Sequence, residues 1–163
     1  MSPSKLTITS ETEIIQVNAP THFPTKLTQS NFPVWKTQVY STLTGLGLLS
    51  YIDGNIIIPD QLKDSKPNPA FVIWNRQDKI ILSAMLGSCH ENIQPLISTA
   101  TSATDMWNRL VTLYANRSRS RIMSLKSRLM NNPCNTRSMG EYLEDIRSTA
   151  DDLAIVGLSL IHI

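Results

Sequence analysis

Five segments of this chain place apolar side chains at steps of three and four residues, and this helical spacing most constrains its fold. The clearest case lies within residues 30–54. Its apolar residues, at steps of four, four and three, are Trp35, Val39, Leu43 and Leu46. Pro33 falls in the first turn, where its missing N–H costs little, and Gly45 and Gly47 suit the end of a helix. The segment therefore predicts an amphipathic helix.

Helix-start signals precede four of the five apolar stripes. They are Ser30 or Asn31 for the first helix, Asn68 with Pro69 for the second, Ser102 with Asp105 for the third and Ser138 with Glu141 for the last. The predicted helices after the first cover residues 69–87, 103–115, 118–132 and 138–157. Pro133 separates the last two helices, and Gly157 closes the last one.

The remaining segments carry weaker signals. Residues 1–25 are polar with three prolines, and we expect a mobile N-terminal arm with at most a short extended piece. Residues 48–60, "LLSYIDGNIIIPD", predict a turn or short extended link, and residues 63–69 predict a loop. Five well-signalled helices without a convincing sheet predict an all-α fold.

Aromatic residues mark the predicted core. Trp35, Trp74 and Trp107 lie on the apolar faces of separate predicted helices, and together with Tyr114 they are the candidate core anchors. A hydrophobic groove for a partner peptide is the alternative interpretation of the tryptophans. Asp78 is the candidate buried polar residue, because it follows Trp74 by four positions and shares its face. We expect a basic side chain or a helix N-terminus as its partner.

The sequence contains no residue pattern that supports catalysis. His22, His90 and His162 show neither the H-E-x-x-H pattern nor a paired helical spacing, and no C-x-x-C is present. The glycines of residues 45–49 end a predicted helix, whereas those of a phosphate loop start one, and no serine lies in a G-x-S-x-G turn. We therefore predict no enzyme activity, no cofactor, no metal site and no small-molecule substrate.

Charge is distributed unevenly, although the net charge is only +2. Residues 117–137 hold six basic and no acidic side chains, whereas residues 141–152 hold five acidic side chains and Arg147. The candidate RNA or subunit contacts in the basic segment are Arg117, Arg119, Arg121, Lys126 and Arg128.

Three interpretations of this charge pattern stay open. The basic and acidic helices meet within one chain or between chains, the "RSRSR" stretch contacts RNA phosphates, or the charges form a solvated face. Residues 115–140 contain no aromatic side chain on which bases could stack, which weakens specific recognition of single-stranded RNA.

The sequence also bears on location. Its first residues lack an apolar run of signal-peptide length, and no stretch of about twenty apolar residues could span a membrane. We therefore expect a cytoplasmic protein without a membrane partner. In that setting Cys89 and Cys134 are expected as reduced thiols.

The order of these segments closely resembles the Gag, or capsid, region of copia-type LTR retrotransposons, particularly of the plant lineages. The segments that carry the resemblance are "LTQSNFPVWKTQV", "YIDG", "NPAFVIWNRQDKIILSAMLGS", "IQPLISTATSATDMWNRLVTLYANRSRSRIMSLKSRL" and "SMGEYLEDI", and they cover roughly residues 25–157. Three motifs are specific only in combination. They are Asn-Phe-x-x-Trp ending at Trp35, Trp-x-x-x-Asp at Trp74 and Asp78, and Trp-x-x-Leu-x-x-x-Tyr at Trp107, Leu110 and Tyr114.

The resemblance implies a capsid-like helical bundle in two lobes. Residues 26–116 correspond to an N-terminal lobe, and residues 117–163 to the first two helices of a C-terminal lobe, with residues 1–25 as the arm. Gag of this kind assembles with itself into virus-like particles that package the element's RNA. The implied partners are therefore further copies of the chain and RNA bound weakly and without sequence preference. The alternative is a host helical adaptor, or a domesticated Gag that binds protein or RNA without forming particles.

The resemblance also implies that the chain is a truncated copy, because Gag of this family continues with further helices past the position of Gly157. We then expect exposed apolar surface on the two helices of the incomplete lobe, and self-association through it. The residues expected to be partly exposed, or to pack on the first lobe, are Ile122, Leu125, Leu129, Leu143 and Ile146.

Overall fold

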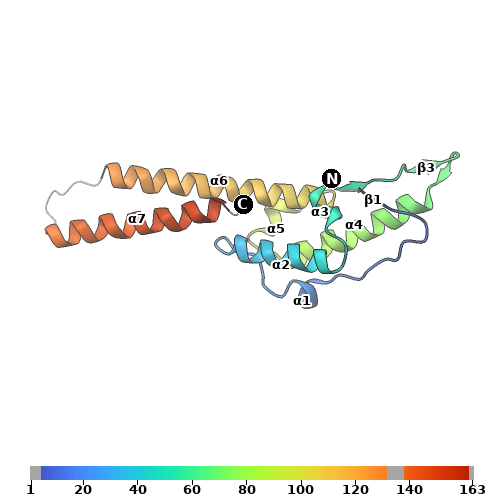
Figure 1. The fold of residues 1–163 in the computed structure, drawn as a ribbon, viewed down its shortest axis with the longest axis horizontal. Coiled ribbons are helices and arrows are strands. Elements are labelled where there is room, and N and C mark those ends of the chain that lie inside the picture. Colours follow the sequence, from blue (N-terminus) through green and yellow to red (C-terminus); the bar gives the residue numbers. More distant parts are fainter. Residues whose placement is uncertain (1–4, 132–137, 162–163) are drawn as a thin grey trace. The chain divides into compact units, whose positions relative to one another are not determined.

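The computed structural model describes the backbone of residues 5–131 and 138–161, with side chains through residue 155. Seven helices and four short strands make up the described part, which confirms the predicted all-α class (Figure 1). The helices are α1 (Ala19–His22), α2 (Phe32–Gly45), α3 (Ser50–Asp53), α4 (Pro69–Gly87), α5 (Gln94–Ile97), α6 (Ala103–Met130) and α7 (Met139–Ile161). The strands are β1 (Leu6–Thr7), β2 (Ile56–Ile57), β3 (Leu62–Lys63) and β4 (Lys66–Pro67). The chain divides into two compact units, Met1–Leu110 and Val111–Ile163.

Three predicted helix starts are confirmed by hydrogen bonds. Asn68 accepts a hydrogen bond from the N–H of Ala70 at the start of α4, and Ser102 Oγ accepts one from the N–H of Asp105 at the start of α6. Ser138 and Glu141 exchange hydrogen bonds at the start of α7, which is the capping box that the sequence predicts.

The start of α2 differs from the prediction. Asn31 occupies the N-cap position but makes no capping hydrogen bond with its side chain. Its Oδ1 instead accepts from the N–H of Thr28 at 2.7 Å, and its Nδ2 donates to the carbonyl of Lys26 at 2.8 Å. The side chain therefore shapes the loop before the helix.

Two predicted helix boundaries are wrong. The helices expected over residues 103–115 and 118–132 form the single helix α6, because no proline or glycine interrupts residues 115–118. Helix α7 continues past Gly157, because an interior glycine costs about 1 kcal/mol and does not by itself end a helix. The predicted break at Pro133 lies outside the described residues.

The predicted link over residues 48–60 contains α3 and β2. Tyr51 and Ile52 of α3 are buried, so this single turn contributes to the core of the first unit. Gly54 ends it with φ of 79°, a left-handed conformation that a residue with a Cβ rarely adopts.

The segment predicted as a mobile arm is packed in the structure from residue 5 onward. Strand β1 pairs in parallel with β2, with Leu6 opposite Ile56, and Ile8, Val17 and Phe23 are buried. Isolated apolar residues in an extended segment show no helical period, and a lone strand is weak evidence by itself, so this packing could not be predicted from the sequence.

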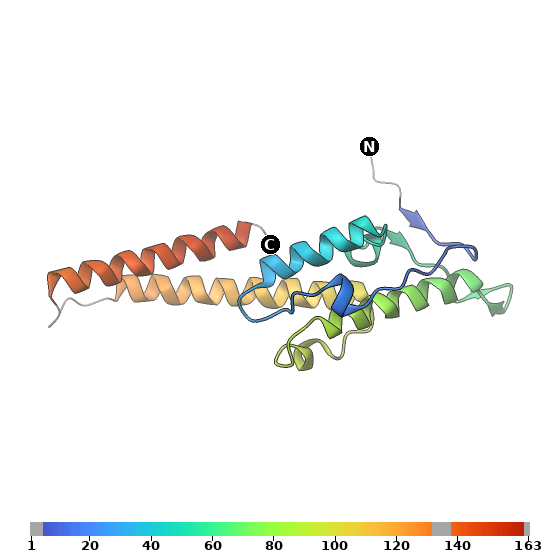
Figure 2. The same cartoon turned by 90° about the horizontal axis from the view of Figure 1, so that it is seen from below.

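Two glutamines hold the backbone of this N-terminal segment. Gln77 of α4 accepts from the N–H of Ile15 at 2.7 Å and donates to its carbonyl at 2.9 Å. Gln38 of α2 makes the same pair of bonds with Thr25, at 3.0 and 3.2 Å. The two sites differ in burial, since Gln77 is only 2% exposed whereas the bonds between Gln38 and Thr25 are exposed. Figure 2 shows the segment running past α4.

The core of the first unit centres on the tryptophan of α2. Trp35 is fully buried, and its ring lies 6.2 Å from that of Trp107 in α6 and 6.2 Å from that of Phe32. Its indole N–H donates to the hydroxyl of Ser88, just after α4, at 3.0 Å. One side chain thus joins three helices by packing and a hydrogen bond.

The second unit is a hairpin made by α7 and the part of α6 from Val111 onward (Figures 1 and 2). Tyr114, Leu125 and Thr149 are its buried residues within the described part. An ion pair joins the two helices at 2.5 Å between Arg128 and Asp145.

The two glutamine sites give a paired test of how the N-terminal segment is held. We expect Gln77→Ala to lower the free energy of unfolding by about 1–3 kcal/mol, because two backbone groups lose partners at a partly buried site. Gln38→Ala should cost less than about 1 kcal/mol, since water can replace an exposed amide. Urea denaturation followed by tryptophan fluorescence measures both variants. Equal effects of the two variants would contradict the assigned role of burial.

Candidate functional site

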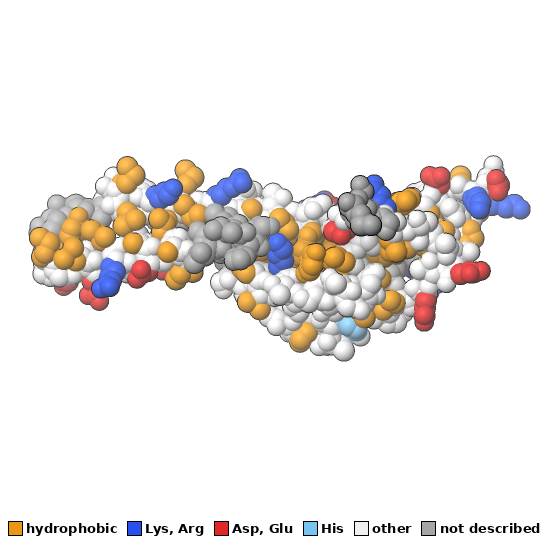
Figure 3. All heavy atoms as spheres, viewed as in Figure 1, with side chains coloured by type: hydrophobic (Ala, Val, Ile, Leu, Met, Phe, Trp, Pro, Cys, Tyr) orange, Lys and Arg blue, Asp and Glu red, His pale blue; other side chains and the backbone are white. Residues whose placement is uncertain are grey.

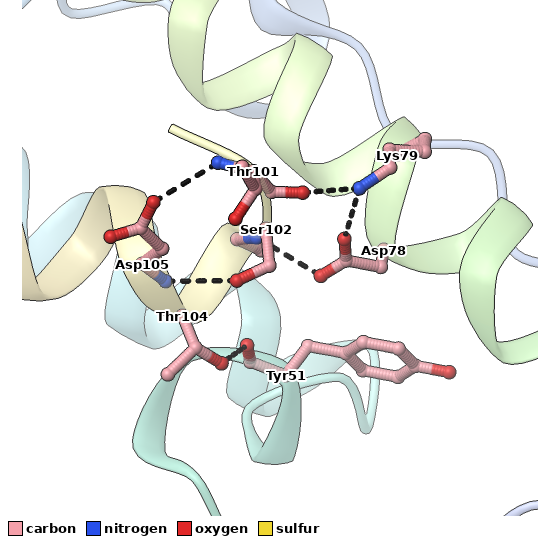
Figure 4. A network of polar contacts seen from close by, with 8 residues as sticks. Tyr51, Asp78, Lys79, Thr101, Ser102, Thr104 and Asp105 are labelled. Atoms are coloured by element: carbon pink, nitrogen blue, oxygen red, sulfur yellow. Dashed lines mark hydrogen bonds and ion pairs between the residues drawn. The ribbon is translucent and has the colours of Figure 1, made fainter. Parts of the chain in front are cut away.

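A buried carboxylate joins α4 to the start of α6. Asp78 is 2% exposed, and its Oδ1 accepts a hydrogen bond from the N–H of Ala103 at 3.0 Å. Its Oδ2 lies 3.1 Å from Nζ of Lys79, which also donates to the carbonyl of Thr101 (Figure 4). Asp78 therefore has both kinds of partner considered from the sequence, a cation and the positive end of a helix.

The network extends along the first turn of α6. Asp105 accepts from the N–H of Thr101 at 3.0 Å and pairs with Arg109 at 2.9 Å. The hydrogen bond from Arg109, followed by the one from Thr101, lowers the pKa of the Asp105 carboxyl. Thr104 donates to the carbonyl of Tyr51 at 2.6 Å, which ties α3 to the same turn (Figure 4).

A cavity of about 480 Å³ adjoins this network. It is lined by Tyr51, Gly54, Ile56, Ile58, Trp74, Asp78, Ser102, Thr104, Asp105 and Asn108. Each oxygen of Asp78 already binds a group of the protein, the N–H of Ala103 on one side and the ammonium of Lys79 on the other. Burial, and secondarily the charge of Asp78, raises the pKa of Tyr51 to about 12, so its hydroxyl stays protonated near neutral pH. The polar groups of this junction therefore hold helices together, and we assign them no chemical step.

Among the described residues, no three His, Cys, Asp or Glu side chains gather closely enough to hold a metal ion. Cys89 is buried, and burial raises the pKa of its thiol to about 12, which makes it a poor nucleophile. Cys134 lies outside the described residues. None of the helices in the described part has the length and apolar character needed to cross a bilayer.

The candidate core anchors occupy different environments. Trp35, Trp107 and Tyr114 are buried. Trp74 is only partly buried, and its ring stacks at a tilt on Phe71 with the centroids 5.5 Å apart. Its buried indole nitrogen has no hydrogen-bond partner among the described residues. On α4, Gln77 and Asp78 are more deeply buried than Trp74. The N-terminal segment after β1 crosses the helix at Gln77 and covers it.

The candidate basic contacts do not form one surface. Arg117 is half-buried, with its guanidinium 5.5 Å from the centroid of the Tyr114 ring, and Arg128 pairs with Asp145. The exposed members without such a contact are Arg119, Arg121 and Lys126. At about 100° per residue, Arg117, Arg121 and Arg128 follow one side of α6, whereas Arg119 and Lys126 follow the other. Composition alone groups these residues together, and the division appears only when each residue is given its angle around the helix.

Large apolar side chains remain exposed on the hairpin. They are Met123, Met130, Met139, Leu143 and Ile155. Of the five apolar residues singled out from the sequence, Leu125 is buried, Leu143 is 57% exposed, and Ile122, Leu129 and Ile146 are half-buried. Figure 3 shows hydrophobic side chains spread over this part of the surface.

Comparison with known proteins identifies relatives of the chain. Residues 39–162 match the protein family described as gag-polypeptide of LTR copia-type. The Retrovirus-related Pol polyprotein from transposon RE1 of Arabidopsis thaliana is 33% identical over 159 residues, which are 95% of this chain and 11% of that protein. The corresponding polyprotein from transposon RE2 of the same plant is 37% identical over 119 residues, which are 71% of this chain and 8% of that protein. No solved structure matches the chain.

The junction at Asp78 can be tested by graded substitution. We expect Asp78→Ala to lower the free energy of unfolding by about 2–3 kcal/mol, because the N–H of Ala103 and the ammonium of Lys79 lose a buried charged partner. Asp78→Asn should cost less, since its amide oxygen can still accept from Ala103. Chemical denaturation gives both values. A neutral effect of Asp78→Ala would show that the carboxylate does not stabilise the fold.

Proposed function

The chain belongs to the gag-polypeptide family of copia-type LTR retrotransposons, and from this premise we propose that it is a structural subunit that associates with itself and packages RNA. The two relatives are polyproteins of which this chain spans about a tenth. The family that matches is the gag polypeptide, which is a structural protein. We accordingly propose a non-catalytic role, carried out in the cytoplasm.

The exposed apolar surface of the α6–α7 hairpin is the observation that supports self-association. Met139 and Leu143 of α7 are 65% and 57% exposed, and Met123 and Met130 of α6 are more exposed still. At about 25 cal/mol per Å², covering even a few hundred Å² of such surface contributes several kcal/mol to association. The first unit also exposes large apolar side chains, such as Val34 and Leu62, but those of the hairpin lie on two neighbouring helices, which favours a protein–protein contact there.

Basic side chains on α6 support the RNA contact. Arg119, Arg121 and Lys126 are exposed, and the helix carries no acid between Val111 and Met130. Phosphate contacts of this kind are independent of base sequence and sensitive to salt. Because no aromatic side chain follows Tyr114 on α6, base stacking does not add specificity.

Assembly separates this proposal from a host adaptor role. We expect the purified chain to sediment as a concentration-dependent oligomer, and electron microscopy of concentrated protein with RNA to show shells or sheets. The exposed apolar surface supplies the driving force. Strictly monomeric sedimentation at high concentration would contradict the proposal and favour an adaptor that binds other proteins.

RNA binding has its own test. We expect Arg121→Ala to weaken binding to single-stranded RNA and to reduce the slope of log K against log salt by about 0.7 for each phosphate that the variant no longer neutralises. The matched control is Lys63→Ala, which removes the same charge from an exposed position on β3. Fluorescence anisotropy over a salt series measures both variants. Equal weakening in the two would remove α6 as the RNA-binding helix.

A further inference from the structure

One side of the α6–α7 hairpin combines apolar and charged residues in an ordered way. We call it the hairpin face. Its apolar members are Ile122 and Leu129 of α6 and Met139, Leu143, Ile146 and Ala150 of α7, all half-buried or exposed. Helix geometry places the exposed Arg119 and Lys126 on the outer edge of α6, with the exposed Met123 and Met130 beside them, and the exposed Glu144 and Asp151 on the outer edge of α7.

The ion pair between Arg128 and Asp145 fixes which residues share this side. The ion pair joins α6 to α7 on the side of the hairpin that is opposite to the hairpin face. Lys126 lies two residues before Arg128 and Leu143 two residues before Asp145, and each step of two turns the side chain by about 160° around its helix. In an antiparallel pair of helices, both therefore fall on the side away from the ion pair. Figure 3 shows a hydrophobic band over this part of α6 and α7, with basic side chains along the α6 edge and mainly acidic ones along the α7 edge.

The charges of the two helices are opposite. The stretch of α6 from Val111 to Met130 has five basic side chains and no acid, whereas Met139 to Ile155 of α7 has five acids and Arg147. The outer edges of the hairpin face are separated by the width of two helices, about 20 Å. That separation is too large for direct ion pairs between them within one hairpin. Arg147 is exposed on the same edge, between Leu143 and Asp151 around the helix, so the α7 edge holds two acids and one base and keeps a net negative charge.

We propose that two copies of the chain pack their hairpin faces together about a two-fold axis that runs along the hairpin. This arrangement places the α6 edge of each copy against the α7 edge of the other and buries the apolar band between them in a four-helix bundle. The two-fold axis perpendicular to the helices would instead set basic edge against basic edge, which is electrostatically unfavourable. The inference rests on the proposed self-association and specifies its surface and orientation.

The size of the hairpin face suits such a contact. About twenty helical residues span about 30 Å, and two helices side by side are about 20 Å wide, so each copy presents about 600 Å². Two copies would bury about 1,200 Å², which is the lower limit of specific protein–protein interfaces. A contact of this size forms reversibly, and opposite charges at its edges fix its orientation.

Charge reversal of the edges tests the orientation. One variant carries Arg119→Glu with Lys126→Glu, so that both of its edges are acidic, and a second carries Glu144→Lys with Asp151→Lys, so that both are basic. We expect each variant alone to self-associate at least about tenfold more weakly than the wild type at low salt, and an equimolar mixture to recover a complex that contains both. Sedimentation equilibrium, with one variant labelled, measures the three cases after nuclease treatment. The control is Lys63→Glu with Lys66→Glu, which should associate as the wild type does.

The outcomes separate this inference from the proposed function. A wild-type protein that associates while both edge variants associate equally well overturns the hairpin-face contact and leaves self-association intact. A wild-type protein that stays monomeric at all concentrations contradicts both. Association that disappears with nuclease shows that RNA bridges the copies, which also overturns the hairpin-face contact.

Discussion

The buried bond between Asp78 and the first turn of α6 is the interaction on which the arrangement of the first unit depends. It fixes the start of the longest helix against α4, and the neighbouring bond from Thr104 to Tyr51 adds α3 to the same point. A carboxylate is suited to this place because the helix N-terminus offers unpaired N–H groups and a partial positive charge. Lys79 balances the remaining oxygen, so the buried charge is fully paired. Trp107, one turn after this anchored start, lies 6.2 Å from Trp35 in the core of the same unit.

Residue patterns predicted the parts of the fold that rest on local interactions. The capping residues Ser102 and Ser138 bond as expected, because a cap is decided by residues three positions apart. The burial of Asp78 could be foreseen from its position on the stripe of Trp74. In contrast, the packing of residues 5–25 depends on contacts such as that between Ile15 and Gln77, which are 62 residues apart and leave no periodic signal. The continuity of α6 was missed for a local reason. A helix boundary was predicted near residue 116, although no proline or glycine lies there to end the helix.

The α6–α7 hairpin shows the same difference between what the sequence could and could not predict. The amounts of positive and negative charge on α6 and α7 could be read from the sequence, and so could the presence of apolar residues between them. Which charges are already paired could not, because Arg128 meets Asp145 only through the antiparallel arrangement of the hairpin. The guanidinium of Arg117 likewise lies over the Tyr114 ring. Arg117 is therefore not part of the exposed basic surface, although it is close in sequence to the exposed basic residues. The basic segment is therefore smaller as a free surface than its composition indicates.

Within the described residues, both units contain a buried polar atom without a hydrogen-bond partner, such as the indole nitrogen of Trp74 and a guanidinium nitrogen of Arg117, and the units differ mainly in how many of their large apolar side chains are buried. In the first unit, Trp35, Gln77 and Asp78 all place their polar atoms on partners within the unit, and the thiol of Cys89 is buried beside the carbonyl of Met85. In the described part of the second unit, only Tyr114 and Leu125 are buried among the large apolar side chains, while others are exposed together with charged residues. Exposed apolar area is stabilised by a partner, so the unit that buries fewer of its large apolar side chains gains more from association. Association through the second unit would therefore leave the core of the first unchanged, which is what a subunit needs in order to keep its fold before and after assembly.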